Sequence, residues 1–272
     1  MEIIVCRLLI RGVPSPVFAL APSLIASVSV LDQSPRATRG KGKGAMPQIL
    51  FVHSSAFPGE VRRENQGSYT RKMARILREN VRGRNVRVLE RDVAARPPGM
   101  IDQSFLVASR TPESRRSPEQ IERLKESDAL VNEVLAADVI AVSCPVYNFG
   151  VPAPLKAWID NIVREGKTYT YGEGHNAKKV YGLLHNKLVV LLQSSGSSGY
   201  QPGGAREALN HADQAVMAVF GQLGVHKFDT AIMEGVCDED DLTLERNWMM
   251  CERRLNEIAD RIRTRWRIQM RS

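Results

Sequence analysis

The chain has 272 residues, of which 43% are hydrophobic, enough for one medium-sized α/β domain. Its four cysteines form no CxxC pair and no metal-ligand spacing with the five histidines, which excludes a disulfide-rich scaffold and a structural metal site. This cysteine usage is typical of a reducing compartment, so we expect a cytoplasmic protein.

The formal net charge of +8 is unevenly distributed. Residues 1–45 hold six Lys or Arg against two acidic residues, a net +4, so the other 227 residues carry only +4. Residues 69–81 and the C-terminal tail are basic, but a solvated helix face and a charged tail explain both. We therefore expect no nucleic-acid partner.

The first 45 residues lack the pattern of a folded domain. Arg11 and three prolines interrupt their apolar stretches, which argues against a membrane-spanning helix. Ala19 and Ala21 form an A-x-A pattern, but the apolar stretch before them is too short for a typical export signal. We expect no membrane association. The predicted organisation is a disordered or over-extended gene start at 1–45, one domain at 46–266 and a basic tail at 267–272.

From residue 46 onward, strand and helix patterns alternate. Short apolar runs predict strands, and apolar residues three and four apart predict helices. Ser117, Pro118 and Gln120 together form a helix-start pattern, which follows a long polar connection at 96–117. The expected strands are 48–54, 86–92, 138–144, 186–194 and 226–235, and the expected helices are 69–81, 117–137, 152–166, 205–224 and about 244–262. This alternation predicts an α/β fold with a doubly wound, five-stranded parallel sheet in the order 2-1-3-4-5 and helices on both faces.

Ligands of such sheets bind at the carboxyl ends of the strands, beside the point where the strand order reverses. The loop after the first strand is rich in hydroxyl groups and carries Arg62 and Arg63 shortly before a helix N-terminus, which favours a phosphate. A polar surface loop with an ordinary Ser N-cap would explain the same residues.

The loops after the third and fourth strands are also unusual. Tyr147 and Phe149 flank Asn148 between rigid prolines, so this turn could lay aromatic surface along a flat ring while its backbone N–H groups meet a polar edge. The loop at 193–205 combines serines with glycines that permit close backbone approach. Aromatics that cover the sheet end and a mobile polar loop are the alternatives. Together the three loops suit a flat ring with a phosphate tail, such as FMN.

The segment PVYNFGVPAPLKAWIDNIVREGKTYTY at 145–171 resembles the FMN-dependent NADH:quinone oxidoreductases, also called azoreductases, of the flavodoxin-like superfamily. The SSGS at 194–197 is similar to the family's Ser-Arg-Gly-Gly loop, and the serines at 54–55 to its first serine contact. The resemblance runs from about Gln48 to Ile262 and implies a flavodoxin-like fold.

The resemblance also implies the residues of an FMN site. The family usually has a Ser-x-Ser in its phosphate loop, and here the nearest residues are Arg62, Arg63 and Glu64, so the arginines, Ser68 and helix N–H groups are expected to hold the phosphate. Tyr169 and Tyr171 are expected to line the substrate. The full set of expected cofactor-binding residues is Ser55, Arg62, Arg63, Ser68, Pro145, Val146, Tyr147, Asn148, Phe149, Ser194, Ser195, Gly196 and Ser197.

The activity implied by the resemblance is hydride transfer from NADH through flavin N5 to quinones, with reductive cleavage of aromatic azo compounds, by a ping-pong mechanism in a homodimer. No catalytic side chain is expected, because FMN carries the chemistry. One alternative is a flavodoxin-like electron carrier, which the slightly basic domain and its insertions at 96–117 and 164–186 disfavour. The other is a flavin-free binding protein whose three loops are structural.

Overall fold

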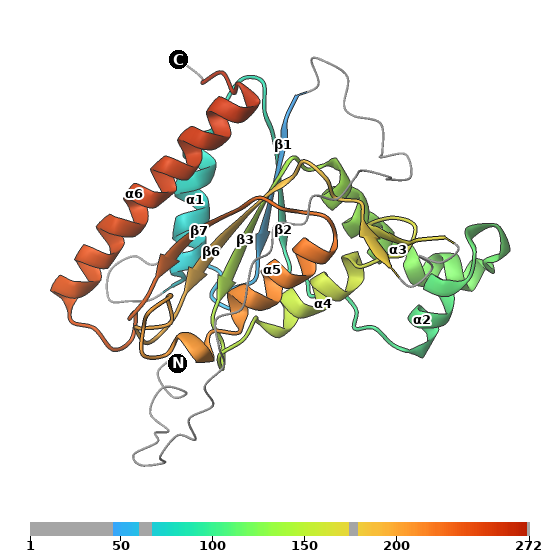
Figure 1. Ribbon diagram of the computed structural model, residues 1–272, viewed down its shortest axis with the longest axis horizontal. Helices are drawn as coiled ribbons and strands as arrows, with labels where there is room; N and C mark the ends of the chain where they lie inside the picture. Colours follow the sequence, from blue (N-terminus) through green and yellow to red (C-terminus); the bar gives the residue numbers. More distant parts are fainter. Residues whose placement is uncertain (1–45, 60–66, 174–178, 271–272) are drawn as a thin grey trace, which may run out of the picture.

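The computed structural model describes residues 46–59, 67–173 and 179–270, so the expectation for residues 1–45 lies outside the described residues. Its centre is a five-stranded parallel sheet in the order β2-β1-β3-β6-β7 (Figure 1). The strands are β1 (Gln48–His53), β2 (Arg87–Asp92), β3 (Val139–Pro145), β6 (Leu188–Ser194) and β7 (Phe228–Met233). Numbered along the chain, these five strands have the order 2-1-3-4-5, which confirms the predicted topology.

Helices cover both faces of the sheet (Figure 1). One face packs against α1 (Tyr69–Val81) and the long α6 (Asp241–Trp266). The opposite face packs against α3 (Pro118–Ala136), α4 (Ala153–Ile162) and α5 (Ala212–Gln222). In the described part of the chain, no helix is both long enough and apolar enough to cross a membrane.

The central strand β3 is buried along its whole length. Ile140 and Val142 pack with α3, α4 and α5, whereas Val139 and Ala141 pack with α1 and α6. Successive side chains of a strand point to opposite faces, so a strand covered on both sides must be apolar at every position. Because β1, β3 and β6 run parallel, their carboxyl ends and the three loops of interest meet at one edge of the sheet.

Local capping fixes where the helices begin. Ser117 Oγ accepts a hydrogen bond from the backbone N–H of Gln120 (3.3 Å), and Gln120 Oε1 accepts one from the N–H of Ser117 (3.0 Å). This reciprocal pair is the predicted start of α3. Ser68 caps α1 in the same way, since its Oγ accepts from the N–H of Arg71. The phosphate-loop candidate Ser68 therefore has a defined place at a helix N-terminus.

The predicted polar connection at 96–117 contains a helix, α2 (Gln103–Arg110). Asp102 caps it by accepting from the N–H of Phe105 at 2.7 Å, and Phe105 packs with Leu124 of α3. Only two residues of this short helix are buried, so its apolar periodicity is too weak to stand out from a polar loop.

The insertion at 164–186 contains an antiparallel hairpin of β4 (Tyr169–Tyr171) and β5 (Val180–Gly182). Helix α5 begins at Ala212 rather than at 205, because the backbone N–H of Arg206 donates to the carbonyl of Gly199 (2.8 Å) and folds this stretch back as a loop.

The C-terminal packing also extends past α6. Ile268 is buried, and the N–H of Arg84 donates to the carbonyl of Gln269 at 2.8 Å.

Candidate functional site

The turn after β3 has an unusual backbone. Tyr147 and Gly150 exchange two backbone hydrogen bonds, of 3.1 and 3.0 Å, across the residues Asn148 and Phe149. Both central residues have positive φ, 49° for Asn148 and 68° for Phe149. A bulky residue such as Phe seldom adopts this conformation, and such strain concentrates at functional sites.

Neighbouring elements hold this strained turn in place. The N–H of Val146 donates to the carbonyl of Ser194 (2.8 Å), and the hydroxyl of Tyr147 accepts from the N–H of Ala56 (3.1 Å). The turn is thereby tied to β6 and to the loop after β1, so the structure brings the three predicted loops together.

The turn presents an aromatic ring and unpaired donors. The side chain of Phe149 is 47% exposed, and its ring centroid lies 6.5 Å from that of Tyr200. Among the described residues, the backbone N–H groups of Asn148 and Phe149 meet no acceptor. A planar ligand with acceptor atoms on one edge would satisfy these donors.

The loop after β6 supplies a second set of donors. Ser194 and Ser195 are buried, and Ser195 Oγ donates to the carbonyl of Ser197 at 2.9 Å. Ser197 Oγ in turn donates to the carboxylate of Asp238, so its hydroxyl proton is already engaged. The N–H groups of Gly196 and Ser197 have no acceptor among the described residues. The predicted residues are therefore suited to contact a ligand through backbone N–H groups.

Glu234, at the end of β7, anchors this loop and was not predicted from the sequence. Its carboxylate accepts from the N–H of Gly199 (3.1 Å) and of Tyr200 (2.8 Å). Gly235 has φ 75°, and a Cβ there would lie 2.6 Å from Ser198 Oγ, so glycine is required for this close approach. Glu234 comes about 35 positions after Gly199 and Tyr200 and meets them only because β7 lies beside β6, so local sequence patterns do not reveal this contact.

In the loop after β1, Ser54 and Ser55 are buried. Ser54 Oγ donates to the carbonyl of Ser143 at 2.6 Å, and Ser55 Oγ accepts from the N–H of Phe57 at 3.3 Å. These bonds fix the loop as it leaves the sheet. The predicted contacts Arg62 and Arg63 lie outside the described residues.

Thr70 is one of the hydroxyl residues of the predicted phosphate loop, although it is not among the expected cofactor-binding residues. Its Oγ1 lies 3.0 Å from Ser68 Oγ, and both residues are buried at the N-terminus of α1. Ser68 and Thr70 thus form a Ser-x-Thr, which is similar to the Ser-x-Ser that the family usually has in its phosphate loop. This pattern is present in the sequence, but it follows a long loop and was therefore not matched to the family's Ser-x-Ser.

The structure does not bring Tyr169 and Tyr171 to these loops. Their ring centroids lie 5.7 Å apart in an edge-to-face arrangement on β4, and Tyr171 is 44% exposed. Their hairpin lies near α2 and α3, away from the carboxyl ends of the sheet strands (Figure 1). Burial, with a smaller effect from Tyr171, raises the pKa of Tyr169. Their substrate-lining role stays a prediction.

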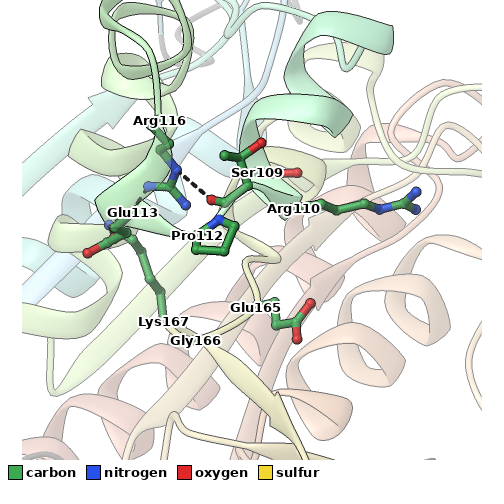
Figure 2. A pocket seen from close by; sticks show the side chains of 9 residues that line it. Ser109, Arg110, Pro112, Glu113, Arg116, Glu165, Gly166 and Lys167 are labelled. Carbon is green, nitrogen blue, oxygen red and sulfur yellow. Dashed lines mark hydrogen bonds and ion pairs between the residues drawn. The ribbon is translucent and has the colours of Figure 1, made fainter.

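A pocket of about 330 Å³ lies next to this hairpin, between the end of α2 and the loop before β4 (Figure 2). Two of the cations that line it have partners: Arg116 Nε donates to the carbonyl of Thr111 at 3.0 Å, and Lys167 pairs with Glu113 and Asp128. Its charged lining does not suit an aromatic ring, whereas the loops at the sheet edge do. We therefore place the candidate site at the loops.

Comparisons with known proteins identify the family and the fold. A family described as having a flavodoxin-like fold matches residues 48–248. The chain is 31% identical over 217 residues to FMN-dependent NADH:quinone oxidoreductase 1 of Pseudomonas fluorescens (strain Pf0-1), a match that covers 79% of this chain and 99% of the relative. It is 43% identical over 135 residues to FMN-dependent NADH:quinone oxidoreductase 2 of Idiomarina loihiensis, covering 50% of this chain but only 56% of that relative's length.

A solved structure shows the same fold. The FMN-dependent NADH-azoreductase from Bacillus anthracis str. Ames Ancestor, in complex with FMN, matches with a TM-score of 0.67 at 19% identity, over 80% of this chain and 99% of that one.

Proposed function

This chain belongs to the family of FMN-dependent NADH:quinone oxidoreductases with a flavodoxin-like fold, and from that premise we propose that it binds FMN at the carboxyl ends of β1, β3 and β6. It uses NADH as the electron donor and reduces quinones by two electrons. Aromatic azo compounds are the second class of acceptor. When bound, FMN supplies the atom that accepts and then donates the hydride.

The observation that carries this proposal is the strained turn at Asn148 and Phe149. Its N–H groups, like those of Gly196 and Ser197, find no acceptor in the part of the chain that the structure describes, and the four form a set of donors at the carboxyl ends of the strands. The polar edge of a flavin ring carries carbonyl oxygens and ring nitrogens that accept hydrogen bonds, so the donor set fits the cofactor. Phe149 supplies apolar surface for the ring.

The other end of the proposed site fits a phosphate. The hydroxyls of Ser68 and Thr70 lie together at the N-terminus of α1, where the helix dipole favours an anion. The first turn of α1 carries no acidic side chain that would repel it. Ser55 lies at the start of the loop between β1 and α1, and its hydroxyl fixes the backbone there by accepting a hydrogen bond from the N–H of Phe57.

These residues bind and orient the cofactor rather than perform acid or base chemistry. NADH and the acceptor use one place in turn, which is a ping-pong mechanism. Steady-state rates measured at several NADH and benzoquinone concentrations should give parallel double-reciprocal lines. Intersecting lines would contradict the shared place.

The tyrosines of β4 suit a homodimer. Tyr171 lies away from the loops of its own subunit, so it can cover a substrate only in the site of a second copy. We expect sedimentation to give a dimer, and Tyr171→Ala to raise the KM for quinone without changing FMN affinity. A monomer with full activity would contradict this arrangement. The buried free thiols of Cys144 and Cys251 fit a cytoplasmic location.

A further inference from the structure

Arg71, in the first turn of α1, has an unusual set of partners. Its Nε donates to the carbonyl of Phe57 (2.6 Å) and its Nη2 to the carbonyl of Ser55 (3.0 Å). Its two Nη atoms also donate to both carboxylate oxygens of Asp92, at 2.7 and 3.1 Å. The side chain is only 11% exposed. One guanidinium thus joins the loop after β1 to the end of β2.

Asp92 is held as firmly as its partner. It pairs in register with His53, the last residue of β1, and its Oδ1 also accepts from the N–H groups of Ala94 and Ala95. Burial alone would raise the pKa of Asp92, but the hydrogen bonds from Arg71 and from the backbone of Ala95 outweigh it and lower the pKa. Asp92 is therefore a charged, fixed anchor.

These contacts show that Arg71 is not available to bind a phosphate directly. Four of its five N–H donors are engaged, and its charge is neutralised by Asp92. Arg71 instead holds the backbone carbonyls of Ser55 and Phe57, and it thereby fixes the backbone turn at residues 55–57. This turn leads away from β1, while Ser68 caps the helix that carries Thr70 and Arg71.

We propose that Arg71 and Asp92 are positioning residues that hold residues 54–59, directly after β1, beside Ser68 and Thr70 in the arrangement that binds the phosphate of FMN. The inference rests on the proposed function. Its distinctive consequence is that Arg71 acts through the loop backbone, so it affects a flavin with a phosphate and leaves a flavin without one unaffected. A planar guanidinium is required, because a lysine ammonium cannot reach the carboxylate and both carbonyls together.

The test compares the affinities of the apoprotein for FMN and for riboflavin, which lacks the phosphate, by quenching of flavin fluorescence. In Arg71→Leu, FMN affinity should fall by about tenfold to a hundredfold, the range for losing hydrogen bonds with a charged partner. Riboflavin affinity should stay within about twofold, since no ring contact changes. Arg71→Lys should lose most of the same FMN affinity. Arg75→Leu is the matched control, because it removes a half-buried cation that pairs with Glu79 one turn further along α1 and should change neither affinity.

A double variant separates positioning from stability. Arg71→Leu leaves Asp92 without its cation, so Tm should drop, and adding Asp92→Asn should recover part of it because Asn keeps an acceptor for Ala94 and Ala95. FMN affinity should not recover, since the carbonyls of Ser55 and Phe57 remain unbraced. Recovery of FMN affinity together with Tm, or equal loss of riboflavin affinity, would overturn the inference. A wild-type protein that binds neither flavin would instead refute the proposed function, and the inference with it.

Discussion

The backbone N–H of His211 donates to the carbonyl of Phe149 at 3.1 Å, which ties the strained turn after β3 to the residue before α5. The loop after β6 leads from Ser194 to His211. The turn is therefore held at both ends, by Ser194 through Val146 and by His211 through Phe149. This double attachment explains how two residues other than glycine keep positive φ next to each other.

The left-handed backbone at Asn148 predicts a stability difference between two substitutions. Asn148→Gly should leave the free energy of unfolding nearly unchanged, because glycine accepts positive φ freely. Asn148→Val should lower it by about 1–3 kcal/mol, because a β-branched residue is strained there. Urea unfolding of both variants measures the difference, and equal stabilities would show that the turn is not strained.

Phe149 should contribute to flavin binding more than to folding. Its ring is about half exposed, so Phe149→Ala should change Tm little. Loss of a ring that packs on the flavin should weaken FMN affinity by about tenfold, as expected for about 1.4 kcal/mol of aromatic contact. Phe149→Tyr keeps the ring and serves as the control. Unchanged FMN affinity in Phe149→Ala would place the flavin away from this turn.

Glu234 should control the order of the loop after β6. Glu234→Ala removes the acceptor of two backbone N–H groups and should cost about 1.5–3 kcal/mol of stability, most of it local to residues 199–206. Limited proteolysis should then cut this loop faster than in the wild type. Glu245→Ala, an exposed acidic residue on α6, is the control for loss of charge. A cleavage pattern equal to that of the wild type would contradict the anchoring role.

His53 predicts a stability change with pH. Burial, followed by the charge of Arg71, lowers its pKa below the ordinary 6.5. A group whose pKa is lower in the folded state stabilises the protein above its unfolded pKa and loses that contribution as pH falls. The free energy of unfolding should therefore decrease from about pH 6.5 downward, and less so in His53→Gln. Chemical unfolding at pH 7.5 and at pH 5.5 measures this, and parallel losses in both proteins would exclude His53 as the cause.

The elements and the position of the loops could be predicted because apolar periodicity and capping act over a few residues, and the alternation of strands and helices then predicted the strand order of a doubly wound sheet. The Ser117 and Gln120 capping pair is an example. Local pattern did not indicate the role of Arg71, since its partner Asp92 comes 21 positions later and meets it only through the pairing of β1 with β2. The hairpin that carries Tyr171 was not predicted, because strands of three residues are too short to show an alternation of apolar and polar residues.

The measurement that tests the account most directly is the absorbance spectrum of the FMN-reconstituted protein under anaerobic conditions, first with NADH and then with benzoquinone. The account predicts flavin bands near ~450 nm that bleach with NADH and return with the quinone, since the cofactor carries the hydride between them. Flavin that NADH leaves unbleached would indicate an electron carrier. A protein that FMN cannot reconstitute would contradict the central claim and make the strained turn at Phe149 a structural feature.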